Sequence, residues 1–275
     1  MIELDQVKMI LGTGLSASKD YMEFKNIVQS CICNGINAFD TAPSYGTESL
    51  LGKVISELEQ EKIVNRSECW VQTKIDPWQM QEKSGDISKY LNHSGKNLGV
   101  SYFDAVLIHW PIPEYLENTL HSLEIAKNNG LIRNIGVCNV RKRHIEELLA
   151  HNHKVDIVQI ERHPLRTCDE DVEYFKSKNI AVQAYSPLCK MNSKIRNNTA
   201  LQLLADKYKR NIGQIIMRWH ISTGVIPVFT TKKVSRIQEY SNLLNFDLEP
   251  EDISLINLIN ENYKLYLESW LCPGY

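Results

Sequence analysis

The chain has 275 residues, 43% of them hydrophobic and 23% charged, and its 31 basic and 33 acidic side chains leave a net charge of −2. This composition excludes an intrinsically disordered chain, and the balanced charge gives no reason to expect a nucleic acid or an acidic membrane surface as a partner. Residues 1–5 (MIELD) lack the basic start of a secretory leader, and no segment approaches the roughly 18 apolar residues that span a bilayer. We expect a cytoplasmic protein, and the seven dispersed cysteines suit a reducing compartment.

Short apolar runs, the expected strands, alternate with amphipathic segments, the expected helices. Runs of this length are typical of buried parallel strands. The eight expected strands are Lys8–Thr13, Gly35–Thr41, Trp70–Ile75, Phe103–Trp110, Ile132–Val137, Asp156–Ile160, Ile180–Tyr185 and Val225–Phe229. Apolar side chains recur at helical spacing in Glu23–Asn34, Ser49–Gln60, Tyr115–Asn129, Arg143–His151, Asp169–Lys178 and Thr199–Arg210.

This alternation predicts one α/β domain over residues 1–275 that closes as a (β/α)8 barrel, the TIM-barrel fold. An open doubly wound sheet is the structural alternative, and such a sheet usually carries GxGxxG after its first strand. Only Gly12 and Gly14 occur there, with no third glycine at the start of a helix. We therefore favour the closed barrel.

Titratable residues stand at the carboxyl ends of the second, third and fourth expected strands. Asp40 ends the second strand, with Tyr45 in the loop that follows, while Lys74 and His109 lie at the ends of the next two strands. Because the carboxyl ends of all strands meet at one mouth of such a barrel, we expect these four side chains to share a site.

The four residues suit the reduction of a carbonyl group, which gains a hydride and a proton. Tyr45 is a usable general acid with an ordinary pKa of about 10, and the ammonium of Lys74 would lower that pKa. Asp40 would position Lys74, and a neutral His109 would donate a hydrogen bond to the carbonyl oxygen. No metal and no covalent intermediate is needed. Each residue alone has a structural explanation, such as a rim ion pair or a core histidine, and the combination favours an enzyme.

Several short segments, in this order and spacing, resemble the aldo-keto reductase family from about Leu11 to Glu239. They are Phe39–Glu48 (FDTAPSYGTE), Gly52-Lys53, Thr73-Lys74, Leu107–Pro111 (LIHWP), Ile135–Asn139 (IGVCN), Gln159–Pro164 (QIERHP), Ala184–Leu188 (AYSPL) and Arg236–Glu239 (RIQE). The resemblance implies hydride transfer from NADPH to an aldehyde or ketone, with Tyr45 as the proton donor. It also implies a dinucleotide bound across the barrel mouth without a Rossmann fold.

The resemblance further implies the cofactor contacts. Asn139 and Gln159 would bind the nicotinamide carboxamide, and Tyr185 would stack on the nicotinamide ring. Hydroxyls and cations around Thr230 and Arg236 would bind the 2′-phosphate, which favours NADPH over NADH. The full expected set is Gly12, Thr13, Asp40, Cys138, Asn139, Gln159, Tyr185, Ser186, Leu188, Thr230, Thr231, Lys232, Arg236, Glu239 and Tyr240.

The chain departs from the family pattern at a few places. Cys138 stands where the family usually has serine, and Tyr240 stands where an asparagine often contacts the adenine. The segment Cys189–Asn198 is short, which predicts an open cofactor groove and fast cofactor exchange. Ile2–Met9 would form a hairpin, with Asp5-Gln6 as its turn, that plugs the barrel bottom.

The expected substrate is a small carbonyl compound in a pocket with aromatic walls. The expected substrate contacts are Trp78, His109, Trp110 and Trp270. A small aldehyde, a keto sugar and a biosynthetic ketone remain open, since a fold does not select among them. Two alternatives to a simple reductase are a sugar-modifying redox enzyme of a biosynthetic pathway and a cofactor-binding regulatory subunit. The oligomeric state is open between a monomer and a weak dimer.

Overall fold

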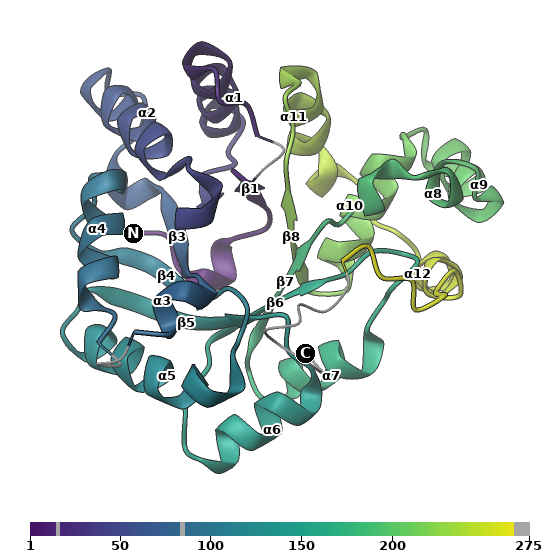
Figure 1. Ribbon diagram of the computed structural model, residues 1–275. Coiled ribbons are helices and arrows are strands. Elements are labelled where there is room, and N and C mark those ends of the chain that lie inside the picture. The colour runs from purple at the N-terminus through teal and green to yellow at the C-terminus, as the bar shows by residue number, and fades with distance from the viewer. Residues whose placement is uncertain (15–16, 83–85, 267–275) are drawn as a thin grey trace.

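The computed structural model describes residues 1–14, 17–82 and 86–266. Its strands lie in the middle of the molecule with helices around them (Figure 1). Within the described residues the strands pair in parallel and in chain order, and β1 pairs with both β2 and β8. This closure confirms the predicted (β/α)8 barrel. The strands are β1 (Ile10–Gly12), β2 (Ala38–Asp40), β3 (Trp70–Ile75), β4 (Phe103–Ile108), β5 (Ile132–Cys138), β6 (Ile157–Glu161), β7 (Ala181–Tyr185) and β8 (Val225–Phe229).

Helices follow the strands, and polar side chains fix where several of them begin. Asp20 caps α1 by accepting from Glu23 N, and Asn198 caps α9 by accepting from Leu201 N. None of the described helices is both long and apolar enough to cross a bilayer. The helices are α1 (Tyr21–Cys33), α2 (Glu48–Gln60), α3 (Pro77–Met80), α4 (Ser88–Leu98), α5 (Pro113–Asn128), α6 (Lys142–Ala150), α7 (Asp169–Ser177), α8 (Ser193–Arg196), α9 (Thr199–Tyr208), α10 (Ile212–Ser222), α11 (Val234–Ser241) and α12 (Pro250–Asn257).

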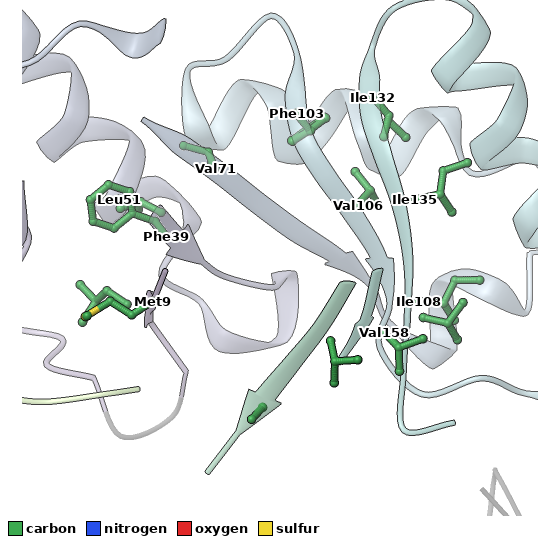
Figure 2. Close-up of a cluster of buried hydrophobic side chains, with 14 of the residues drawn as sticks. Met9, Phe39, Leu51, Val71, Phe103, Val106, Ile108, Ile132, Ile135 and Val158 are labelled. Carbon is green, nitrogen blue, oxygen red and sulfur yellow. The ribbon is translucent and has the colours of Figure 1, made fainter. Parts of the chain in front are cut away.

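Alternate residues of each strand serve two separate apolar clusters. On β4, Val106 and Ile108 belong to the large cluster that also takes in residues of the surrounding helices, such as Leu51 of α2. Figure 2 shows these side chains beside those of the neighbouring strands. Ala105 and Leu107 belong instead to a smaller cluster with Trp70, inside the barrel. Because side chains alternate along a strand, the same strands supply both the outer and the inner cluster. Each fully buried large apolar side chain stabilises the fold by about 2 kcal/mol.

The N-terminal segment covers the barrel bottom, but the predicted hairpin of Ile2–Met9 is wrong. Leu4–Gln6 form a 3-10 turn, closed by a hydrogen bond of 2.9 Å from Glu3 N to Gln6 Oε1. Ile2 and Leu4 pack against the inner cluster, and Arg133 donates to Ile2 O at 2.9 Å. A two-residue hairpin favours a turn with glycine or asparagine at positive φ, which Asp5-Gln6 does not supply.

Candidate active site

The carboxyl ends of the strands surround a cavity of about 600 Å³, a size that suits a small molecule or part of a cofactor. Most of the predicted site residues lie in its wall, although they come from all parts of the chain. They are Gly12, Asp40, Tyr45, His109, Trp110, Cys138, Asn139, Gln159, Tyr185, Ser186, Leu188, Thr230 and Arg236. Strand closure therefore brings these residues together.

Lys74 lies below this wall, fully buried and paired with Asp40. Its Nζ donates to Asp40 Oδ2 at 2.6 Å and to Thr41 O at 3.0 Å. The other carboxylate oxygen, Asp40 Oδ1, accepts from Gln72 at 2.7 Å and from Gln159 at 3.2 Å. Burial acts to lower the pKa of Lys74, but Asp40 and other neighbours raise it, so that it ends above its ordinary value. Lys74 is therefore held as an ammonium by a carboxylate whose oxygens are both satisfied.

Tyr45 ends a 3-10 turn, Pro43–Tyr45, and the chain leaves this turn through Gly46 at a φ of 64°, a conformation that favours glycine. The Nζ of Lys74 lies 4.7 Å from the centroid of the Tyr45 ring. Burial raises the pKa of Tyr45 to about 12, while Lys74 lowers it in part. Lys74 thus lowers the pKa of Tyr45, as expected, but burial raises that pKa by more. Tyr45 keeps its proton at neutral pH, as a proton donor must.

His109 connects Tyr45 to a residue that the sequence analysis missed, Asp76. His109 Nε2 lies 3.3 Å from the Tyr45 hydroxyl, and His109 Nδ1 lies 2.6 Å from Asp76 Oδ1. Burial lowers the pKa of His109 although Asp76 raises it, so the ring is neutral. Because a carboxylate only accepts, Nδ1 carries the proton and Nε2 accepts from Tyr45. This tautomer does not fit the expectation that a neutral His109 donates to a carbonyl oxygen.

Asp76 also fixes the loop that carries Tyr45. Its carboxylate accepts from the backbone nitrogen and from the hydroxyl of Ser44, both at 2.9 Å. A signal for Asp76 was present in the sequence. It stands two residues after Lys74 at the end of the same strand, and side chains two apart on a strand share a face.

The residues expected around a nicotinamide form one hydrogen-bonded wall. The Tyr185 hydroxyl donates to Asn139 Oδ1 at 2.8 Å, and Asn139 Nδ2 donates to His109 O at 2.9 Å. Gln159 Nε2 donates to Gln183 at 2.8 Å, which leaves Gln159 Oε1 as an acceptor for an amide. Two amides beside an aromatic ring suit the carboxamide and the flat face of a nicotinamide. These residues therefore fit the expected cofactor.

Several expected cofactor residues lie outside the cavity wall. Thr13 is buried and donates to Asp40 O at 3.0 Å. Tyr240 packs edge-on against Phe229 with 5.1 Å between ring centroids, and Glu239 accepts from Asn211 at 2.9 Å. Thr13 and Tyr240 thus support the wall from behind, whereas Glu239 bonds to the residue that caps α10. Thr231 and Lys232 also lie outside it, and Lys232 is exposed.

The substrate side differs from the sequence prediction. Trp78 lies on α3, is 52% exposed and does not line the cavity, because the helix that begins at Pro77 follows directly after the strand end. Trp110 lines the cavity, and Trp270 lies outside the described residues. Tyr266 was not predicted, yet it lines the cavity and stands edge-on to Tyr185 with 5.7 Å between ring centroids. No periodic pattern marks Tyr266, since it belongs to a loop.

The family model of the aldo/keto reductase family matches residues 8–261. A glyoxal reductase of Bacillus subtilis (strain 168) is 31% identical over 255 residues, which covers 92% of this chain and 90% of the relative. A methylglyoxal reductase of Escherichia coli (strain K12) is 30% identical, with coverages of 93% and 90%. An aldo-keto reductase of Bombyx mori, whose crystal structure is in complex with NADP, is 31% identical in sequence. The two structures superpose with a TM-score of 0.85 over 94% of this chain and 90% of the Bombyx mori chain. The chain therefore belongs to the aldo/keto reductase family of NADP(H)-dependent oxidoreductases that reduce carbonyl groups.

Proposed function

We propose that this protein reduces a small aldehyde or ketone with NADPH, and that Tyr45 donates the proton. One observation carries the proposal: the Tyr45 hydroxyl lies 3.3 Å from His109 Nε2, and the Tyr45 ring lies 4.7 Å from Lys74 Nζ, at the wall of one cavity. A phenol, an ammonium and a neutral imidazole at this spacing suit proton donation to a carbonyl oxygen.

When bound, the reduced nicotinamide supplies the hydride. The proton comes from Tyr45, which holds it at neutral pH because its pKa is about 12. Negative charge then develops on the phenol oxygen, and the buried ammonium of Lys74 stabilises it. Asp40 keeps that ammonium in place at 2.6 Å. His109 orients the Tyr45 hydroxyl through Nε2.

Asn139, Gln159 and Tyr185 would hold the nicotinamide, and Thr230 and Arg236 would bind the phosphate that distinguishes NADPH from NADH. The exposed guanidinium of Arg236 lines the cavity and supports this assignment. The short segment after Leu188 remains a prediction of fast cofactor exchange. The named activities of the two bacterial reductases support small reactive aldehydes as substrates.

Action in the cytoplasm is part of the proposal. The cysteines in the described part of the chain are free, and most are buried, which suits a reducing compartment. The site groups themselves argue for catalysis over a purely regulatory subunit. Tyr45 at the cavity wall already lies beside both His109 and Lys74, and binding a cofactor alone does not require that.

Tyr45→Phe tests the proposal, because it removes one hydroxyl and keeps the ring. We expect kcat/KM for NADPH-dependent reduction of 4-nitrobenzaldehyde to fall by about 100-fold or more, the scale of a lost general acid. Binding of NADPH, followed by quenching of tryptophan fluorescence, should stay within about twofold. Tyr90→Phe on α4 is the matched control and should leave both values unchanged. Undiminished reduction by Tyr45→Phe would remove Tyr45 from its proposed role.

A further inference from the structure

A small recess adjoins the active-site cavity at the starts of α6 and α7, two helices that lie next to each other in Figure 1. It shares the wall residues Trp110, Asn139, Tyr185 and Tyr266 with the cavity. Its volume is about 30 Å³, whereas one water needs roughly 10–15 Å³. The recess therefore has room for a group of a few atoms.

Arg166 lines this recess, and its charge has no partner. The residue is only 7% exposed, and its backbone pairs with that of His163. Among the residues that the structure describes, its guanidinium makes no hydrogen bond or ion pair, and its Nε is buried without an acceptor. A buried charge without a partner is unfavourable, and folded proteins pair almost all such groups. An unpaired guanidinium in a recess can accept an anion from outside the chain.

The two carboxylates of the recess, Glu161 and Asp171, bond to groups other than Arg166. Glu161 accepts from the backbone nitrogens of Leu265 and Tyr266, at 2.7 and 3.1 Å. Asp171 accepts from the backbone nitrogen of Lys142 at 2.8 Å. These carboxylates hold the loop before Tyr266 and the start of α6 in place. Neither carboxylate forms an ion pair with the guanidinium of Arg166, so the geometry leaves that guanidinium open to a further acceptor.

Arg166 lies close to the wall shared with the cavity. Burial raises the pKa of the Cys168 thiol and of the Tyr185 hydroxyl, and the Arg166 guanidinium lowers both. Tyr185 faces the cavity that also holds Tyr45. A single small molecule can therefore place one end beside Tyr45 and an anionic end beside Arg166.

We propose that the recess is a carboxylate subsite with Arg166 as its ligand, and that the substrates include aldehydes or ketones that carry a carboxylate. This inference rests on the proposed function and names a substrate class for the same site. A planar guanidinium matches a carboxylate through two parallel hydrogen bonds.

The test compares two aldehydes of the same shape, 4-carboxybenzaldehyde and its neutral analogue 4-carbamoylbenzaldehyde. The wild type is expected to show a kcat/KM about tenfold higher for the acid. Arg166→Met removes the charge and keeps the length of the side chain. It should lower kcat/KM for the acid by about 10- to 100-fold, mainly through KM, the scale of hydrogen bonds to a charged group. Reduction of the amide should stay within about twofold.

Arg141→Met is the matched control, because Arg141 lines the same recess but is paired with Asp171 at 3.3 Å. We expect it to lower kcat/KM for the acid by less than about threefold. An effect as large as that of Arg166→Met would overturn the assignment of Arg166. Succinic semialdehyde and its amide form a second pair that covers a shorter spacing between carbonyl and carboxylate.

The outcomes separate this inference from the proposed function. Reduction of the amides with no preference for the acids would overturn the carboxylate subsite and leave the proposed function intact. An equal loss on acid and amide in Arg166→Met would show a structural role and would also overturn it. Failure of the wild type to reduce any of these aldehydes would overturn both. If Arg166→Met does not fold, Arg166→Lys should still lose several-fold on the acids alone, because an ammonium cannot form the paired contact.

Discussion

The two ends of the barrel differ in how their buried charged side chains are paired. At the bottom, Asp104 on β4 is 1% exposed and binds Arg66 at 2.9 Å and Arg133 at 3.1 Å. The same carboxylate accepts from the backbone nitrogen of Val71 at 2.9 Å. The apolar cluster around Trp70 fills the interior beside this network. The charges of this end serve the stability of the fold.

At the mouth, buried charges lie beside the residues that line the cavity. Lys74 pairs with Asp40 at 2.6 Å, and its Nζ still lies 4.7 Å from the Tyr45 ring centroid. The guanidinium of Arg166 makes no hydrogen bond or ion pair with the described residues. Within one barrel, the mouth thus differs from the bottom in holding buried cations next to a cavity, as the proposed function requires.

Lys74→Met should have the largest effect, because it removes the charge on which the mouth depends. It takes away the cation that stabilises the phenolate of Tyr45 and leaves Asp40 without its counter-charge. We expect kcat/KM for 4-nitrobenzaldehyde reduction to fall roughly 1000-fold, or about 4 kcal/mol. Arg133→Met breaks an ion pair at the bottom and should leave kcat/KM within about twofold. A folded Lys74→Met enzyme with more than a tenth of wild-type kcat/KM would contradict the role of Lys74.

Asp104→Asn, unlike Lys74→Met, should lower the stability of the fold without lowering the activity. An amide cannot accept from two guanidinium groups and a backbone nitrogen at once, so Arg66 and Arg133 lose their common partner. We expect the free energy of unfolding in urea at pH 7 to fall by about 3 kcal/mol. The kcat/KM of the folded fraction should be unchanged. A variant as stable as the wild type would show that this network does not stabilise the bottom.

The strands and the placement of the candidate catalytic residues were predictable because local pattern and barrel geometry determine both. Each expected strand overlaps an observed one, although the ends differ: Lys8–Thr13 was expected and β1 covers Ile10–Gly12. The ladder is shorter because pairing with both neighbours sets its length. Asp40, Lys74 and His109 stand at strand ends, and closure brings such positions together whatever their distance in the chain.

The rest depends on tertiary contacts that no short pattern encodes. The helix α4 (Ser88–Leu98) was not expected, because Gly95 and few apolar residues weaken its periodicity, and only Leu91, Ser94 and Leu98 are buried. Arg166 and Tyr266 lie in loops, where side-chain direction follows from packing. The unpaired charge of Arg166 in particular is a property of its surroundings and has no signal in the sequence.

Asp76→Asn should have the smallest effect and would sharpen the account of the mouth. The amide Nδ2 would donate to His109 Nδ1, which moves the ring proton to Nε2 and ends its acceptance from Tyr45. We expect kcat to fall about tenfold, or about 1.4 kcal/mol, with KM for the aldehyde within about twofold.

The pH profile separates this positioning role from a general loosening of the loop around Ser44. Asp76 raises the pKa of His109 against the stronger lowering effect of burial, so its removal lowers that pKa further. In Asp76→Asn, His109 therefore stays neutral down to a lower pH. Because the site works with a neutral His109, the pH at which kcat/KM falls on the acid side should also be lower. A loosened loop would instead lower kcat/KM equally at every pH. An acid limb that stays in place, together with an unchanged kcat, would mean that the 2.6 Å contact between Asp76 and His109 does not control how Tyr45 presents its proton.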